Sequence, residues 1–279
     1  MSVTIEETLK LSRLLDSDSA RLDVELLLCH VLACERIYLR TWSDKVLSSQ
    51  ELDEFEVLFR RRQKGEPIAH LLGSRSFWTL ELSVTPDTLI PRPDTEILVE
   101  HALSLDLPDD ADVLDLGTGT GAIALSLATE KPHWHITATD VFPHVVELAA
   151  GNALKNQVQH VRFICSAWFD AIPASRFNLI VSNPPYIDSE DPHLVEGDVR
   201  FEPTSALVAG NQGLADIQHI VQEAKSYLHH SGWLILEHGY QQADAVRTLF
   251  NNAGYTHVQT LKDYAQLDRM TVGQVMSAK

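Results

Sequence analysis

The sequence has 279 residues, enough for two domains, a hydrophobic fraction of 44% and a formal net charge of −17. This charge argues against a large nucleic-acid surface, because non-specific affinity for phosphates rests on Lys and Arg. The three cysteines are scattered without metal-ligand spacing, and neither a signal-peptide pattern nor an apolar run of transmembrane length appears, so we expect a cytoplasmic protein with reduced thiols, no metal site and no membrane segment.

Residues 1–72 predict a small bundle of four or five short helices. Thr4-x-x-Glu7 and Ser48-x-x-Glu51 are capping-box sequences, which mark two helix starts. One helix is expected to bury a face of apolar side chains at helical spacing, namely Leu22, Leu26, Leu27 and Val31. The sequence leaves open whether this domain is pure scaffold or docks a partner.

The one dense basic stretch is Arg60-Arg61-Arg62-Gln63-Lys64, at the end of an expected helix. A charge run at this place favours a solvated helix face that complements the helix dipole. A local basic stripe for nucleic acid is the alternative.

Residues 73–92 change to a strand-like pattern, in which Phe77 to Val84 alternate between apolar and polar residues and Pro86 and Pro91 follow. We interpret this stretch as a β-hairpin linker between the helical domain and a second domain, residues 93–279. Asp94 or Thr95 is expected to cap the next helix. Arg92 follows a stiff turn and faces either a cleft or the surface.

Strand and helix patterns alternate from about residue 111 onward, which predicts a mostly parallel sheet with helices on both faces. The expected strands are 112–116, 135–139, 161–165, 177–182, 233–237, 256–261 and 269–275. The expected helices are 121–130, 143–155, 214–229 and 240–252. The fold class is therefore α/β, a doubly wound seven-stranded sheet with a ligand cleft at its strand ends.

A glycine loop follows the first strand of this domain, with the residues Gly117, Thr118, Gly119, Thr120 and Gly121. Glycines allow a tight turn and a close approach of ligand to backbone, and the next helix offers free N–H groups at its start. The spacing is GxGxG, and Ala122 stands where a dinucleotide-binding loop has its third glycine.

Asp140 and Trp168 follow the next two strands. A carboxylate about twenty residues after a glycine loop suits the two hydroxyls of a ribose, although an N-cap for the helix that Pro143 opens is the alternative for Asp140. The indole of Trp168 suits an adenine face, although packing in the core is its alternative.

The segment Ser182-Asn183-Pro184-Pro185-Tyr186 ends the fourth strand, because proline cannot continue a central strand. The carbonyls of Asn183 and Pro184 can point together into the cleft, where they suit a planar –NH₂ group that Tyr186 covers. Two acceptors raise the electron density of such a nitrogen, so the pattern predicts methyl transfer to an amide or an aromatic amine. A ligand that pairs adenosine with an amino-acid carboxylate fits the glycine loop, and that ligand is S-adenosylmethionine.

Nearly the whole chain resembles the release factor glutamine methyltransferases. The most specific segments are Leu89-Ile90-Pro91-Arg92-Pro93-Asp94-Thr95-Glu96 and Arg200-Phe201-Glu202-Pro203, and Leu236-Glu237-His238-Gly239 is also similar to the family. The resemblance implies a Rossmann-like methyltransferase domain that methylates the side-chain amide of a glutamine, in a GGQ-type motif of peptide chain release factors, and so supports translation termination. It also implies that the helical domain helps to dock the release factor.

Carried over by position, the resemblance implies cofactor contacts from the Gly117–Gly121 loop, Asp140, Trp168 and Asn183. It implies that Asn183, Pro184, Pro185 and Tyr186 hold the glutamine, with Asn183, Pro184 and Tyr186 in the catalytic roles. The family commonly has an acidic residue where this chain has Ala167, so a side-chain hydrogen bond from that position to the adenine amine is lost.

Two other functions stay open in the sequence. Asn-Pro-Pro-Tyr also suits an adenine amine of DNA or RNA, although the charge of −17 makes a nucleic-acid substrate unexpected. A catalytically silent binding module is the third reading. We expect a monomer, because a protein that docks a large partner need not self-associate.

Overall fold

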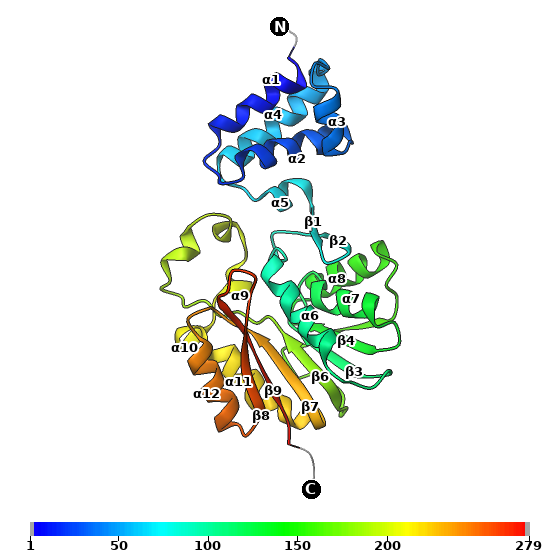
Figure 1. Ribbon diagram of the computed structural model, residues 1–279, viewed down its shortest axis with the longest axis vertical. Helices are drawn as coiled ribbons and strands as arrows, with labels where there is room; N and C mark the ends of the chain where they lie inside the picture. The colour runs from blue at the N-terminus through cyan, green and yellow to red at the C-terminus, as the bar shows by residue number, and fades with distance from the viewer. Residues whose placement is uncertain (1–2, 277–279) are drawn as a thin grey trace. The chain divides into compact units, whose positions relative to one another are not determined.

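The computed structural model describes residues 3–276, which divide into two compact units (Figure 1). The first unit comprises the chain up to Ser74 together with Val195–Phe201, and the second comprises Arg75–Leu194 and the chain from Glu202 onward. The sequence pattern does not predict that residues 195–201 pack with the helical unit. Within residues 3–276, none of the helices combines the length and apolar character that crossing a membrane requires.

The first unit is helical, as predicted. Its elements are α1 (Ile5–Leu9), the 3₁₀ helix η1 (Lys10–Leu14), α2 (Ala20–Leu32), α3 (Arg36–Thr41), α4 (Ser49–Gln63) and α5 (Ile68–Leu72). Both capping boxes form: the Thr4 hydroxyl accepts from the Glu7 N–H, and the Ser48 hydroxyl accepts from the Glu51 N–H. The two capping-box predictions are thus confirmed.

The buried face of α2 differs from the predicted one. Leu22 is 39% exposed, whereas Val24, Leu27 and Leu28 are fully buried. The acidic side chain of Glu25 also lies on the buried side, where it is paired with Arg21 and Arg36. Apolar spacing alone does not reveal that an acidic residue belongs to the buried side.

Arg62 corrects the prediction of a solvated basic face. Arg60 does lie in solvent beside Glu56, but the Arg62 side chain is only 10% exposed. Its guanidinium contacts Asp23 at 2.8 Å and Asp198 at 3.2 Å, and it also donates to the Glu66 carbonyl. Arg62 therefore ties α2 and the 195–201 segment to the end of α4.

A hairpin of β1 (Ser74–Phe77) and β2 (Leu80–Ser83) lies in the second unit from Arg75 onward, followed by η2 (Pro93–Thr95) and α6 (Glu96–Ser104). The Asn152 side chain accepts a hydrogen bond from the Ser83 N–H at 2.7 Å and donates one to the Ser83 carbonyl. The hairpin is therefore fixed to α8 (Pro143–Lys155). Thr95 stands at the N-cap of α6 without capping it, because its hydroxyl donates to Glu237 instead. The expected position of the cap is therefore confirmed at Thr95, but its side chain makes no capping hydrogen bond.

Seven strands form the main sheet within the described residues, in the order β5-β4-β3-β6-β7-β9-β8. They are β3 (Asp112–Leu116), β4 (His135–Asp140), β5 (Val161–Cys165), β6 (Phe177–Ser182), β7 (Leu228–Glu237), β8 (Thr256–Lys262) and β9 (Asp268–Gln274). The pairs are parallel from β5 to β7, and β9 is antiparallel to both of its neighbours. The predicted doubly wound α/β sheet is confirmed.

Two helical layers cover the sheet, and alternate strand residues supply their cores (Figure 1). Val113, Val181 and Ile235 face α6, α7 (Ala122–Glu130) and α8, whereas Leu114 and Ile180 face α11 (Ala215–Tyr227) and α12 (Ala243–Asn252). Successive side chains of a strand point to opposite faces of the sheet, and helices cover both faces. The central strands therefore consist of continuous runs of apolar residues.

Two stretches depart from the predicted boundaries. β7 begins at Leu228, five residues earlier than expected, because buried Leu228 pairs with Phe177 before the register shifts at Leu179–Trp233. Between β6 and α11 the chain forms short helical turns that the sequence pattern does not mark: η3 (Pro192–Val195), η4 (Val199–Phe201), α9 (Thr204–Leu207) and α10 (Gly210–Gly213).

Candidate active site

The carboxyl ends of the central strands stand level with one another. Leu116 of β3 pairs with Thr139 of β4 on one side and with Ser182 of β6 on the other, and Ser182 pairs with Leu236 of β7. The chain runs outward from β3 to β5 and then returns to β6 beside β3, so the sheet has its topological switch point between β3 and β6. Ligands bind in the crevice at such a point, between the glycine loop and Asn183.

The glycine loop is held in a shape that requires glycine. Gly117, Gly119 and Gly121 have φ values of +68°, +55° and +86°, in the left-handed region that side chains disfavour. A Cβ at Gly119 would meet nothing within 4 Å, so open space lies over this residue. At Gly121 a Cβ would approach Leu125 to 3.0 Å, so this glycine serves the packing of α7.

Asp115 braces the loop from below, which the sequence reasoning did not assign. Its side chain is fully buried, and one carboxylate oxygen accepts the Thr118 hydroxyl at 2.7 Å and the Ala124 N–H at 3.2 Å. Burial raises its pKa to about 7. The motif Asp-Leu-Gly-Thr-Gly contained the signal, since an acidic residue just before a glycine loop on a buried strand needs a polar partner.

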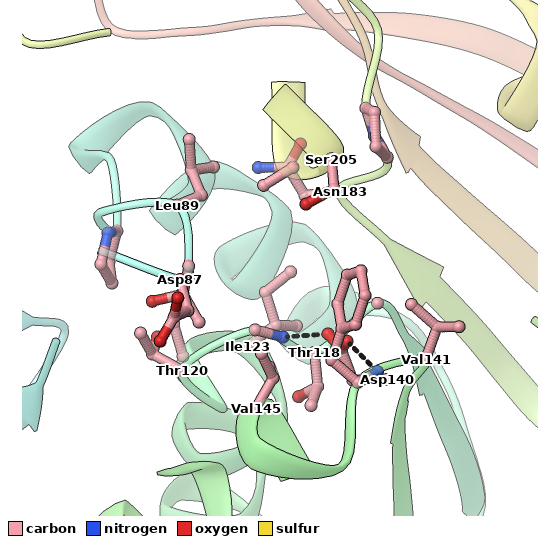
Figure 2. A pocket seen from close by; sticks show the side chains of 18 of the residues that line it. Asp87, Leu89, Thr118, Thr120, Ile123, Asp140, Val141, Val145, Asn183 and Ser205 are labelled. Atoms are coloured by element: carbon pink, nitrogen blue, oxygen red, sulfur yellow. Dashed lines mark hydrogen bonds between the residues drawn. The ribbon is translucent and has the colours of Figure 1, made fainter. Parts of the chain in front are cut away.

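Asp140 supports the loop from the side. Its carboxylate accepts the Gly119 N–H at 3.1 Å and the Phe142 N–H at 3.2 Å, the two dashed lines in Figure 2. Phe142 takes the N-cap position of α8, so the alternative of Asp140 as the helix cap is wrong. Burial raises the Asp140 pKa, which these N–H donors oppose.

A cavity of about 270 Å³ opens above these loops. Of the predicted site residues, it is lined by Gly117, Thr118, Gly119, Thr120, Asp140, Trp168, Asn183 and Pro185. Gly121, Pro184 and Tyr186 are not among the described residues on its wall. Figure 2 shows Asn183 and Ser205 on one side of the cavity, with Thr120 and Val145 across from them.

Trp168 forms part of the wall after β5. Its φ of +47° lies in the left-handed region, and its ring packs over Gly117, where an added Cβ would lie 3.5 Å from the indole. Asp216, at the start of α11, also lines the cavity; burial raises the Asp216 pKa, and the interaction with the Trp168 side chain opposes this rise. No spacing in the sequence links these two residues, 48 positions apart.

Asn183 is anchored from the side of α6. Its Nδ2 donates to the Thr95 hydroxyl at 3.3 Å, and that hydroxyl donates to Glu237 at 2.7 Å. The Tyr186 hydroxyl donates to the other Glu237 oxygen at 3.3 Å, and Gln242 donates to the Tyr186 carbonyl at 2.9 Å. The Asn-Pro-Pro-Tyr segment is therefore fixed at both ends by buried polar side chains.

Arg92 faces the cavity, which decides between its two alternatives. One guanidinium nitrogen contacts both oxygens of Glu202, at 2.9 and 2.8 Å, and the Glu202 side chain is fully buried. The described wall residues include three acidic ones, Asp87, Asp140 and Asp216, against one basic one, Arg92. Such a wall suits a ligand that carries a positive charge better than a pyrophosphate.

Sequence comparison matches two family models, the PrmC N-terminal domain over residues 10–73 and the methyltransferase small domain over residues 93–197. Full-length relatives are the release factor glutamine methyltransferases of Aliivibrio fischeri and Vibrio cholerae, at 51% and 52% identity, with 98% of each chain covered. That of Pseudomonas aeruginosa is 52% identical, with 97% of this chain and 98% of the relative covered.

Two solved structures share the fold at low identity. A methyltransferase from Pyrococcus furiosus superposes with a TM-score of 0.55 at 18% identity, with 78% of this chain and 98% of that chain covered. The hMettl16 catalytic domain, solved with an RNA hairpin, has a TM-score of 0.57 at 15% identity, with 72% and 77% covered. These similarities establish the methyltransferase architecture of the second unit.

Proposed function

We propose an activity for this chain because it belongs to the family of release factor glutamine methyltransferases. The proposed reaction transfers a methyl group from S-adenosylmethionine to the side-chain amide nitrogen of a glutamine in a peptide chain release factor. The product, an N-methylated glutamine, supports translation termination, which places the reaction in the cytoplasm. The observation that carries the proposal is the convergence of the glycine loop and Asn183 on one cavity at the switch point.

The cavity fits the proposed cofactor. Gly119 leaves open space for close approach to the backbone, and the Asp140 carboxylate is held at the wall by two N–H donors, with lone pairs left for ribose hydroxyls. The Trp168 indole offers a flat apolar face, and the acidic wall favours a sulfonium over a phosphate. When bound, S-adenosylmethionine supplies an electrophilic methyl group on that sulfonium.

The residues of this chain act on the glutamine amide. An amide nitrogen is a weak nucleophile because its lone pair is delocalised into the carbonyl. The side-chain oxygen of Asn183 and the backbone carbonyl of Pro184 accept its N–H groups, which orients the nitrogen and stabilises the positive charge that develops there. Positioning of this kind is worth about 7–11 kcal/mol in well-oriented cases. We propose that Tyr186, which is held to Glu237, covers the face of the amide plane.

The helical first unit is proposed to help dock the release factor, and the protein to act as a monomer. Within this proposal the domains are residues 1–72, the hairpin linker 73–92 and the catalytic domain 93–279. Methylation of an adenine amine, the alternative that Asn-Pro-Pro-Tyr leaves open, is not favoured by the family relationship.

Asn183→Ala tests the proposed role of Asn183. Loss of one preorganised polar contact typically lowers a rate by about 10²–10³, and we expect at least that loss in turnover. Calorimetric titration of S-adenosylmethionine should show a much smaller change in affinity. Unchanged turnover would contradict the proposed role. A wild-type protein that does not bind the cofactor at all would favour the silent binding module.

A further inference from the structure

A buried carboxylate, Glu237, lies next to the Asn-Pro-Pro-Tyr segment and is not among the described residues on the cavity wall. Glu237 ends β7, level with Asn183, and only 2% of it is exposed. It belongs to the segment Leu236-Glu237-His238-Gly239, which the proposed reaction does not use. Each of its two oxygens accepts a hydrogen bond from a hydroxyl group of a different motif. The donors are Thr95 of the Pro91–Glu96 segment, at 2.7 Å, and Tyr186, at 3.3 Å.

The single proton of the Thr95 hydroxyl decides how Asn183 is oriented. The Thr95 proton points to a Glu237 oxygen, which can accept it in the carboxylate and also as the carbonyl oxygen of the neutral acid. The Thr95 oxygen then has only lone pairs to offer, and its other neighbour is the Asn183 side chain at 3.3 Å. The amide must therefore turn its nitrogen towards Thr95, and its oxygen is left for the cavity.

Orientation matters because the two ends of an asparagine amide have nearly the same shape and opposite hydrogen-bonding character. With its oxygen towards the cavity, Asn183 accepts from a substrate –NH₂ group. With its nitrogen there, donor would face donor, and the acceptor pair with the Pro184 carbonyl would be lost. Thr95 is 4% exposed, so water does not compete freely for its hydroxyl.

We propose that Thr95 and Glu237 are positioning residues that hold the Asn183 amide with its oxygen towards the substrate nitrogen. This inference rests on the proposed function, since it names the residues that orient the acceptor used there. Thr95 lies on the cavity wall and Glu237 is not among the described wall residues, and neither of them is proposed to bond to the reacting nitrogen or methyl group. Each acts through the direction of a hydrogen bond.

Substitutions at Thr95 test the hydroxyl. Thr95→Val keeps the shape and removes the hydrogen-bonding group, and it should lower kcat by about 10–100-fold, the usual effect of losing an outer partner of a functional residue. The affinity for S-adenosylmethionine should change less than about threefold. Thr95→Ser should restore most of the loss. Thr139→Val, at another buried threonine, controls for removal of a hydroxyl from the fold.

Reversal of the hydrogen-bond direction is the sharper test. In Glu237→Gln, the side chain can face Thr95 with its –NH₂ group while its oxygen accepts from Tyr186, or with its oxygen while its –NH₂ group donates to the Tyr186 hydroxyl. In the first arrangement the Thr95 proton must point to Asn183, which turns the amide over, so turnover falls by the fraction of molecules that adopt it. In Asn183→Asp the same reversal is favourable, because a carboxylate accepts from Thr95 and still offers an oxygen to the cavity.

We therefore expect Glu237→Gln to lower kcat in the wild-type background and to raise it in the Asn183→Asp background, measured as methyl transfer to purified release factor. A merely structural role would give losses in both backgrounds. That result, or full activity of Thr95→Val, would overturn the inference while leaving the proposed function in place.

The network is also tested without a protein substrate. Thr95→Val and Asn183→Ala remove the same hydrogen bond, so their effects on denaturant unfolding should be less than additive in the double variant. Additive effects would overturn the inference. Wild-type protein that transfers no methyl group to the release factor would instead refute the proposed function.

Discussion

Two carboxyl groups are fully buried beneath the strand ends, Asp115 in β3 and Glu237 in β7. Burial is the main cause that raises the pKa of both side chains to about 7. Thr118 and the Ala124 N–H oppose the rise at Asp115. Thr95, Arg269 and Tyr186 oppose it at Glu237, whereas Asp94 adds to it.

These shifts set the sign of a pH dependence. In the unfolded chain these two carboxyl groups have pKa values of about 4, so the folded protein binds both protons more tightly than the unfolded chain does. Their contribution to stability is complete below about pH 4 and is lost as the pH rises through about 7. Each group changes the free energy of unfolding by about 1.4 kcal/mol per pH unit in that window.

Glu237→Gln removes one of the two protons from this balance. Between pH 5 and 7 the free energy of unfolding of the variant should fall less steeply with rising pH than that of the wild type. The difference in slope should correspond to about one bound proton. Urea unfolding of both proteins at several pH values measures the difference, in which all unchanged groups cancel. Parallel curves would mean that Glu237 titrates alike in the folded and unfolded chain.

Only part of the site follows from the sequence at the residue scale. The glycine loop, Asp140, Trp168 and Asn183 each come directly after a strand with a clear apolar pattern, so the parallel sheet brings them to one edge. Thr95, Asp216 and Glu237 approach Asn183 or Trp168 from distant elements. Their contacts depend on helix packing and strand register, which one sequence does not display.

At the scale of elements, Asn152 of α8 joins two parts of the second unit. It is 1% exposed, bonds Ser83 of the hairpin in both directions and donates to the Thr120 carbonyl of the glycine loop at 2.9 Å. The hairpin, predicted as a linker, is thus part of the support of the loop. Asn156, one helical turn later, bonds Glu81 of the hairpin in the same manner but does not reach the loop.

Asn152→Ala should lower the free energy of unfolding by about 2–4 kcal/mol, because buried backbone groups lose their partners. It should also weaken cofactor binding in a calorimetric titration. Asn156→Ala is the matched control and should leave that affinity nearly unchanged. Equal cofactor affinities in the two variants would show that the loop does not depend on Asn152.

The Arg62 cluster is the corresponding feature of the first unit. Removal of the guanidinium leaves Asp23, with a side chain only 5% exposed, without its charged partner and frees Asp198 on the 195–201 segment. A basic run in a sequence does not say which of its members turns inward, since that depends on where Asp23 lies on α2.

Arg62→Ala should therefore destabilise the first unit by about 3–5 kcal/mol, the usual cost of breaking a buried ion pair. Arg60→Ala, which removes an exposed pair on the same helix, should cost less than about 1 kcal/mol. Chemical unfolding followed by hydrogen exchange at the backbone amides of α2 and α4 measures both, since these helices belong to the first unit. Similar costs would contradict the buried role of Arg62.

At the scale of the whole molecule, the alternation of strands and helices was sufficient to predict the sheet. Each strand after β2 is recovered to within a few residues, except for the start of β7, where pairing with Phe177 extends it. The assignment of residues 195–201 to the helical unit was not predictable, because its contacts, such as Arg62 with Asp198 and Arg200 with the Lys64 carbonyl, join residues that are far apart in the sequence.

The net charge of −17 also belongs to this scale. It predicts little binding of single-stranded DNA or RNA at physiological salt, because few cations are available to replace phosphate counterions. A gel-shift titration measures this. Tight, salt-dependent binding would restore the adenine-methylation alternative to consideration.

The proposed activity is tested most directly by methyl transfer from labelled S-adenosylmethionine to a purified release factor, followed by peptide mass mapping, with Asn183→Ala alongside. We expect one added methyl group on a single glutamine with the wild type and at least about a hundredfold slower transfer with the variant. Label that enters added nucleic acid while the release factor stays unmodified would contradict the proposed activity.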